Sequence, residues 1–202
     1  RPTPTDEDLT EEVFGSKLMQ AAQIGNASRV EELLAEGIKV DESVKNKVTA
    51  LHVACRGNHV VTADVLAAAG ANVDACTTSG ITPLILAAEE SCIKVVDMLC
   101  RMRANPAAVD RHQRSPLSVA AEKGNADIVE ALLDAGAPIN HFNERGQTVL
   151  TVSCAFGHVE VADTLLQRKA DPLLFSDVKG TNRGVDTALI AACRSNSLEL
   201  VQ

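Results

Sequence analysis

The hydrophobic and polar positions of the chain recur at a fixed interval. A hydroxyl residue followed two positions later by Leu marks six places, and the first five of these lie 33 residues apart. The sixth follows after 39 residues, so the last interval contains six extra residues. A period of this length is typical of a solenoid in which one small unit is repeated and stacked. The six starts are Ser16, Thr49, Thr82, Ser115, Thr148 and Thr187.

Each start predicts a pair of helices. The hydroxyl can accept a hydrogen bond from the free amides of a first turn, and Pro83 and Pro116 stand at the first helical position, where no donor is lost. Ala-rich stretches such as Ala87-Ala88 predict a short first helix that allows close packing. A second helix follows, with apolar residues at helical spacing. These are Val30, Leu33, Leu34, Val96, Leu99, Cys100, Val129, Leu132, Leu133, Ala162, Leu165 and Leu166.

Glycine ends the second helix in several repeats, at Gly37, Gly70 and Gly136. A residue with positive φ is wanted there, and glycine adopts it freely. Arg103 and Lys169 occupy the same position in two other repeats. Either they adopt a left-handed conformation that costs about 1 kcal/mol, or the turn differs there.

The pattern resembles the ankyrin repeat over roughly residues 16–202. The resemblance implies an all-α solenoid of paired antiparallel helices, with short β-hairpin fingers between repeats and a concave surface made of fingers and first helices. It departs from the family at the His of the TPLH stretch, which survives only as His52. The matching stretches are Thr82-Pro83-Leu84, Ala87-Ala88, Gly157-His158, Leu132-Leu133 and Gly70-Ala71-Asn72-Val73-Asp74.

The repeats predict the organisation of the whole chain. We expect an acidic N-terminal segment over residues 1–12 and one array over residues 13–202. Because the chain begins with Arg and stops within a repeat, we expect it to be a fragment of a larger protein. The expected repeats lie near 13–45, 46–78, 79–111, 112–144 and 145–183, the last with an insertion at 176–184, followed by a truncated repeat at 184–202.

Composition excludes several classes of partner. The formal charge is −8, and nothing in the sequence builds the cationic face that a nucleic acid backbone needs. No apolar run is long enough to span a bilayer, and no signal peptide pattern opens the chain. The sequence therefore predicts an intracellular protein, cytoplasmic or nuclear, that is monomeric as an isolated array and binds neither nucleic acid nor the membrane interior.

The cysteines and most histidines have structural explanations. Cys55, Cys154 and Cys193 share one position in the first helix, and helix layers 8 to 10 Å apart keep them from bridging. No C-x-x-C spacing occurs, so we expect neither a metal site nor a cofactor. His52 and His158 match family positions where the imidazole ties neighbouring turns together. We interpret His59, in a comparable turn, in the same way, and expect His112 and His141, on fingers, to be exposed.

Residues that differ between repeats are the candidates for contact with a partner. Phe156 stands where other repeats have Gly57, Glu90, Lys123 and Ser195, so we expect either an exposed aromatic anchor or a ring folded against the neighbouring repeat. Basic finger residues suggest a rim around it that suits an acidic and hydrophobic peptide. The predicted partner-binding residues are Arg111, His112, Arg114, Glu122, Lys123, Glu144, Arg145, Gln147, Phe156, Lys179 and Arg183.

The sequence therefore predicts a protein-interaction module that binds a protein or peptide on its concave face, and not an enzyme. No phosphate-binding glycine loop, H-E-x-x-H pair or nucleophile elbow is present. An alternative is a substrate-recruiting or regulatory arm of a multidomain enzyme, ligase or channel. A methyl-lysine reader is a further alternative, but the absence of Trp and Tyr leaves no ordinary aromatic cage.

Overall fold

The computed structural model describes residues 16–174 and residue 188. The chain divides into two compact units, unit 1 (residues 1–105) and unit 2 (residues 106–202). The described part of unit 1 contains α2 (Lys17–Gln23), α3 (Ala27–Ala35), the short 3₁₀ helix η2 (Lys45–Lys47), α4 (Ala50–Arg56), α5 (Val60–Ala68), α6 (Pro83–Glu89) and α7 (Ile93–Arg101). That of unit 2 contains α8 (Pro116–Lys123), α9 (Ala126–Asp134), α10 (Val149–Phe156) and α11 (Val159–Gln167).

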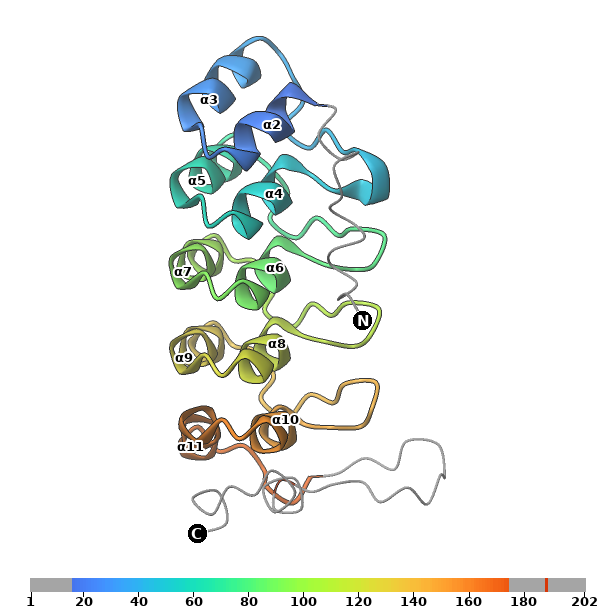
Figure 1. Cartoon of the computed structure of the whole chain (residues 1–202), viewed down its shortest axis with the longest axis vertical. Helices are drawn as coiled ribbons and strands as arrows, with labels where there is room; N and C mark the ends of the chain where they lie inside the picture. Colours follow the sequence, from blue (N-terminus) through green and yellow to red (C-terminus); the bar gives the residue numbers. More distant parts are fainter. Residues whose placement is uncertain (1–15, 175–187, 189–202) are drawn as a thin grey trace. The chain divides into compact units, whose positions relative to one another are not determined.

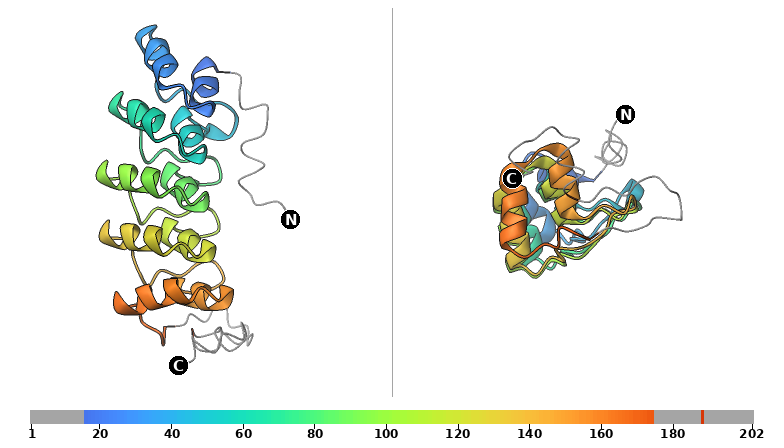
Figure 2. Two further views of the ribbon diagram at one scale, coloured as in Figure 1. Left: turned by 60° about the vertical axis from the view of Figure 1, so that its left-hand side comes forward. Right: turned by 90° about the horizontal axis from the view of Figure 1, so that it is seen from below.

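Each unit is built from helix pairs stacked in two layers (Figure 1). In unit 1 the first helices α2, α4 and α6 pack on one another in that order, and the second helices α3, α5 and α7 do the same. In unit 2, α8 packs on α10 and α9 on α11. The loops that we call fingers project on the side of the first helices, away from the second helices (Figure 2). The expected all-α repeat architecture is confirmed.

The helices begin where the hydroxyl residues predict. Ser16, Thr49, Thr82, Ser115 and Thr148 are all N-cap residues with extended backbone. Thr82, Ser115 and Thr148 accept a hydrogen bond from the backbone amide three residues later. Ser16 differs, because its hydroxyl donates to Glu42 Oε2 instead. Side-chain caps thus fix the start of the first helix in the described repeats after the first one.

The core is a narrow stripe of aliphatic side chains between the layers. Val30, Val96 and Val129 on the second helices are fully buried, as are the leucines three positions after them. The apolar residues four positions after them lie at its edge: Leu34, Cys100 and Leu133 are half-buried, and Leu166 is 47% exposed. The buried stripe is therefore narrower than the sequence pattern predicts, because the helix turns that position toward solvent.

The fingers are turns closed by single contacts rather than paired strands. Their recurring backbone hydrogen bonds join the amides of Val44, Thr77, Asp110 and Asn143 to the carbonyls four residues later. In the described residues the only antiparallel bridges are Ser43 with Thr49 and Phe142 with Thr148. The expected β-hairpins are thus reduced to isolated bridges, because a five-residue turn leaves no length for a ladder.

Neighbouring repeats are joined by histidines that reach back along the array. In unit 1, His59 Nε2 donates to the Gln23 carbonyl at 2.8 Å. In unit 2, His158 Nε2 donates to the Glu122 carbonyl at 2.9 Å. Both are structural histidines, as predicted.

Glycine makes room for each of these histidines. Gly25 has a φ of +71°, and a Cβ there would lie 2.4 Å from His59 Nδ1. Gly124 has a φ of +75°, and a Cβ there would lie 2.5 Å from His158 Nδ1. Any larger residue at either position would therefore collide with an imidazole that is already fixed by its hydrogen bond.

His52 is enclosed between the start of α4 and the next finger. Its Nδ1 accepts from the Thr49 amide at 3.3 Å and from the Thr49 hydroxyl at 2.8 Å, while Nε2 donates to the Ile81 carbonyl at 3.1 Å. The side chain is fully buried. Burial lowers the pKa of His52 to about 4, since the neutral ring satisfies all three contacts and the charged ring would be desolvated.

Arg103 and Lys169 adopt the left-handed conformation, with φ of 61° and 67°. Of the two possibilities that the sequence leaves open, strain in an unchanged turn is therefore correct. Both side chains are exposed. The strain thus has no compensating burial at either position.

We expect Gly124→Ala to destabilise the protein more than Gly136→Ala. Both glycines have positive φ, but a Cβ at Gly136 meets nothing within 4 Å. Backbone strain alone should lower the free energy of unfolding by about 1 kcal/mol, and the collision with His158 should add about 1 kcal/mol or more. Urea denaturation of both variants measures the difference. Adding His158→Asn to Gly124→Ala should recover part of the loss, and equal losses in the two single variants would contradict the proposed steric fit.

Arg103→Gly and Lys169→Gly should each raise the free energy of unfolding by about 1 kcal/mol, because glycine adopts positive φ without strain. Thermal unfolding of the single variants measures this. Arg101→Gly is the matched control, since Arg101 ends α7 and glycine should weaken that helix. A lower melting temperature in both Arg103→Gly and Lys169→Gly would refute the strain argument.

The stability of the protein should fall in mild acid because of His52. The unfolded chain binds a proton at this side chain below a pH of about 6.5, whereas the folded chain does so only below about 4. The contribution is fully present above pH 6.5 and is lost as the pH falls toward 4, to an extent of about 3 kcal/mol. Denaturant unfolding between pH 4 and 7 should show that the free energy of unfolding depends less on pH in His52→Thr than in wild type. Threonine is chosen because Thr151 is the equivalent residue of another repeat. An unchanged pH dependence would contradict this origin.

Candidate partner-binding surface

The predicted surface residues of unit 2 fall into two clusters at opposite ends of the first helices. The finger cluster consists of Arg111, His112, Glu144 and Arg145, which precede α8 and α10. The turn cluster consists of Glu122, Lys123 and Phe156, at the ends of the same helices, together with the structural His158 beside Phe156. A helix of eight residues is about 12 Å long, so the clusters are about that far apart. Of the cations expected to form a basic rim around Phe156, only Lys123 lies at the same end of the first helices, and Arg111, Arg114 and Arg145 lie at the other end.

A chain of hydrogen bonds joins two fingers within the finger cluster. Arg111 Nε donates to His112 Nε2 at 3.3 Å, and His112 Nδ1 contacts Glu144 Oε2 at 3.1 Å. The second contact therefore uses the Nδ1–H tautomer. The Glu144 amide also donates to the His112 carbonyl at 3.3 Å. These contacts hold the cluster in one arrangement before any partner binds, which reduces the entropy lost on binding.

Two of the predicted contact residues stabilise a finger instead. Arg114 Nε donates to Asp110 Oδ2 at 2.7 Å, and the Asp110 side chain is only 1% exposed. The side-chain Oε1 of Gln147 accepts from Asn143 Nδ2 at 3.2 Å, and the backbone amide of Gln147 donates to Asn143 Oδ1 at 3.0 Å. Since these polar groups are already engaged inside their own turns, Arg114 and Gln147 are weaker candidates than the exposed Arg111 and Arg145.

The two finger histidines are not exposed as the sequence analysis expects. His112 and His141 are both half-buried, and His141 Nε2 donates to the Gln113 carbonyl at 3.1 Å. Their rings lie between adjacent fingers, where the hydrogen bonds to the neighbouring finger hold them. Sequence spacing places them on fingers but does not reveal which way they turn.

Phe156 is the central feature of the turn cluster. It is 57% exposed, so the structure favours the exposed ring over the ring folded against the neighbouring repeat. The ring stacks on His158 at a centroid distance of 6.0 Å and an interplanar angle of 4°. His158 is itself fixed by its bond to Glu122. The exposed ring of Phe156 is therefore held by stacking on a histidine that is itself hydrogen-bonded to the preceding repeat.

Both clusters contain charged side chains that form no ion pair within the described residues. Within the described residues the structure gives no ion pair to Lys123, Arg145 or the Glu122 carboxylate, and all three side chains are exposed. Lys123 occupies on α8 the position of Phe156 on α10. A partner would thus meet an aromatic ring and a cation side by side on adjacent helices.

The remaining predicted residues, Lys179 and Arg183, lie outside the described residues, as do the 176–184 insertion and Cys193. Several exposed apolar residues, among them Ile24, Val61 and Leu173, are not among the predicted contact residues. Ile24 holds the position of Phe156 in the first repeat and is 71% exposed. The 33-residue spacing could have identified it.

Three of the five cysteines that the structure describes are buried. Cys55, Cys92 and Cys154 are buried, and burial raises the pKa of each thiol, which keeps it protonated. Cys76, which is exposed, and Cys100, which is half-buried, also have free thiols. Over the described ranges no group of three or more His, Cys, Asp or Glu could hold a metal ion. No described helix has both the length and the apolar character needed to cross a membrane.

Comparison with known proteins supports the resemblance seen in the sequence. A family model described as ankyrin repeats in three copies matches residues 18–110 and 102–176. The crystal structure of the human ASB11 ankyrin repeat domain matches with a TM-score of 0.79 at 32% sequence identity, over 92% of this chain and 80% of that one. A comparison with curated proteins gave no match. Chains of solved structures that match number 543, so the fold is too common to identify a partner by itself.

Proposed function

Because the chain belongs to the ankyrin repeat family, whose arrays generally bind proteins, we propose that its partner lies across the fingers and first helices of unit 2. This face corresponds to the concave side expected of the family. We assign no catalytic role, and propose instead that the array recognises an extended segment of another protein.

The exposure of Phe156 is the observation that carries this proposal. Its equivalents Gly57, Glu90 and Lys123 are small or charged, and the apolar equivalent Ile24 is 71% exposed, so the position has no role in the core. Aromatic side chains that are rigid and exposed are frequent binding anchors, because they bury a large area on contact with little loss of side-chain entropy. The stack on His158 restricts the ring further.

The charges support a partner that is both acidic and hydrophobic. Lys123 beside the ring, and Arg111 and Arg145 on the fingers, are exposed cations on a chain with a formal charge of −8. An acidic segment would gain contacts with these side chains and would be steered toward them. The Glu122 carboxylate lies next to Lys123 and would disfavour a partner with unbroken negative charge.

The separation of the clusters sets a spacing within the partner. An extended peptide advances about 3.3 Å per residue, so about four residues span the 12 Å between the turn cluster and the finger cluster. We therefore propose a segment with an apolar residue for Phe156 and an acidic residue about four positions away for Arg111 or Arg145. Lys179 and Arg183 remain predicted contacts.

A recruiting arm of a larger enzyme, ligase or channel is compatible with the same binding surface. No described residue favours one of these hosts over another.

Binding of a fluorescent peptide library should test the surface. The peptides carry one Leu and one Glu separated by one to seven Ala or Ser residues. We expect the tightest binding near a separation of four, and a loss of about fivefold or more in Phe156→Ala. Arg145→Gln should weaken binding and reduce its dependence on salt.

Ile24→Ala is the matched control, because it removes an exposed apolar side chain from the equivalent position in unit 1. It should leave binding unchanged. Circular dichroism checks that each variant is folded. Equal affinity for wild type and Phe156→Ala would remove Phe156 from the binding surface and refute the proposal.

A further inference from the structure

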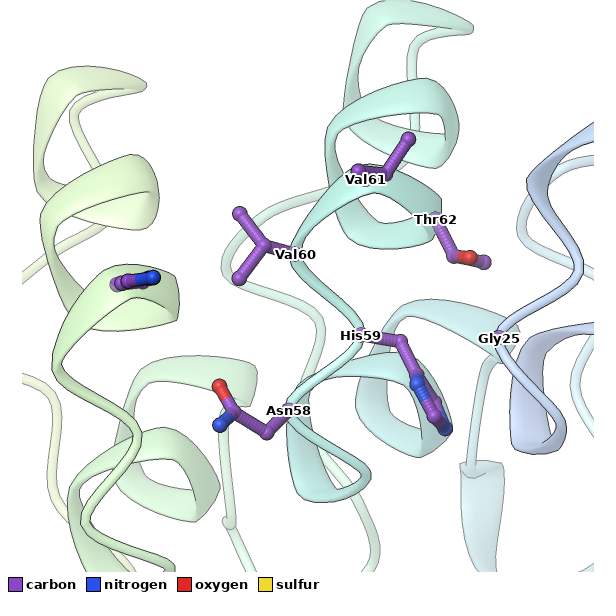
Figure 3. A pocket seen from close by; sticks show the side chains of 7 residues that line it. Gly25, Asn58, His59, Val60, Val61 and Thr62 are labelled. Carbon is purple, nitrogen blue, oxygen red and sulfur yellow. The ribbon is translucent and has the colours of Figure 1, made fainter.

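A hollow lies in unit 1, at the start of α5 (Figure 3). It has a volume of about 360 Å³. Its walls come from three successive repeats, and none of its lining residues is acidic. The lining residues are Gly25, Asn58, His59, Val60, Val61, Thr62 and Lys94.

The helix that begins there has no side-chain cap. The second helices α3 and α9 begin after Asn26 and Asn125, whose side chains accept from the amides of Arg29 and Ile128. The corresponding residue of α5 is His59, whose ring makes no cap hydrogen bond and instead donates from Nε2 to the Gln23 carbonyl. The helices α7 and α11, which begin after Cys92 and His158, also lack a side-chain cap.

Two amides at the start of α5 have no acceptor in the described part of the chain, and one of them, that of Thr62, stands where the asparagines cap Arg29 and Ile128 in the other helices. Within the described residues, the amides of Val60 and Ala63 donate to the carbonyls of Asn58 and His59. No such bond is given for the amides of Val61 and Thr62. Amides at a helix N-terminus attract anions, since the helix dipole adds to their own positive charge.

Thr62 supplies a second and independent indication of a ligand. It lines the hollow, is 1% exposed, and its Oγ1 has no hydrogen-bond partner. Figure 3 shows its side chain on the first turn of α5, directed toward the turn that carries Gly25. Val95, Ile128 and Val161 fill the same position elsewhere, so packing does not require a hydroxyl there. A buried hydroxyl without a partner calls for one that the chain itself does not provide.

Charge and apolar surface define the ligand. Lys94 is exposed and has no ion pair within the described residues, so it adds a cation to the two amides. Val61 is 69% exposed, whereas Ser28, Lys94, Asp127 and Glu160 hold its position in the other described repeats. The hollow therefore combines an anion-attracting centre with an apolar margin.

We propose that this hollow is a carboxylate-binding site, which takes an acidic side chain of a partner protein whose neighbouring apolar part lies on Val61. One carboxylate oxygen accepts from the amides of Val61 and Thr62, and the other faces Lys94. Rotation of the Thr62 side chain brings its hydroxyl to the bound oxygen. A single cation and two amides suit one negative charge better than the two of a phosphate. That the carboxylate comes from a protein rests on the proposed function.

Acetate is a sufficient probe of the site itself. In a titration followed by amide NMR at constant ionic strength, acetate should shift the Val61 and Thr62 amides until they saturate. Acetamide has nearly the same shape without the charge and should not shift them. Lys94→Gln should weaken acetate binding by about three- to fivefold, whereas the exposed Lys39→Gln should leave it unchanged.

Thr62→Val separates the ligand contact from simple packing. Without acetate this variant should melt at a higher temperature than wild type, because it removes an unsatisfied buried hydroxyl. With saturating acetate the difference should shrink, and acetate should bind about threefold more weakly than to wild type. A structural threonine with no part in binding would give the same difference in melting temperature with and without acetate.

Three outcomes would overturn the assignment: no saturable shift at Val61 and Thr62, an equal response to acetamide, or tighter binding of inorganic phosphate than of acetate. The titration uses neither Phe156 nor a peptide. Failure of this site and failure of the surface in unit 2 are therefore distinguishable.

Discussion

The register between neighbouring repeats depends on side chains that reach the main chain of the adjacent repeat. His59 and His158 bind carbonyls of the preceding repeat in units 1 and 2. At the finger bases, Asp41 and Asp74 accept from the amides of Asn72 and Asn105, 31 residues further on. A helix pair cannot bury its apolar stripe alone, so these bonds select how the pairs stack. They hold the candidate binding residues at fixed spacing along each unit.

The same histidine has different consequences in the two units. In unit 2, His158 supports the ring of Phe156 from beneath while its Nε2 holds the preceding repeat. In both units the histidine leaves the second helix that follows it, α5 or α11, without a side-chain cap, and in unit 1 the uncapped amides lie beside Thr62 and Lys94. One structural contact thus presents an aromatic surface in one place and exposes amides in another. Both candidate sites arise from the joints between repeats rather than from added segments.

Much of the fold could be predicted from the sequence because it depends on local chemistry. Hydroxyl residues cap helices and glycines end them wherever they stand, so the starts and ends followed from the 33-residue spacing. The same spacing placed Arg103 and Lys169 at the end of the second helix but left open whether the turn is unchanged there, and the structure shows the left-handed conformation. The sequence did not predict that two of the fingers contain one isolated bridge instead of a β-hairpin. A five-residue turn and a short hairpin differ only in length, so their sequence patterns are the same.

The candidate sites were less predictable, since they depend on which way a side chain turns. Arg114 and Arg145 both stand on fingers, yet one is paired with the buried Asp110 and the other is exposed. The sequence does not show that Asp110 lies within reach. Nor does it show that Thr62 lacks a hydrogen-bond partner, because this requires the position of every neighbouring acceptor. Phe156 could be singled out because Gly57, Glu90, Lys123 and Ser195 at the same position are polar or small.

The steric fit between glycine and histidine also constrains the order in which the two positions can be substituted. A histidine at 59 or 158 can be accommodated only when the residue at 25 or 124 has no side chain. Glycine must therefore come first when the contact arises, and histidine must leave first when it is lost. In the next repeat of unit 1, the residues equivalent to Gly25 and His59 are Asn58 and Cys92. Neither the glycine nor the histidine is present there. Repeats of this kind can diverge freely in their contact residues, while this joint changes only in one sequence of steps.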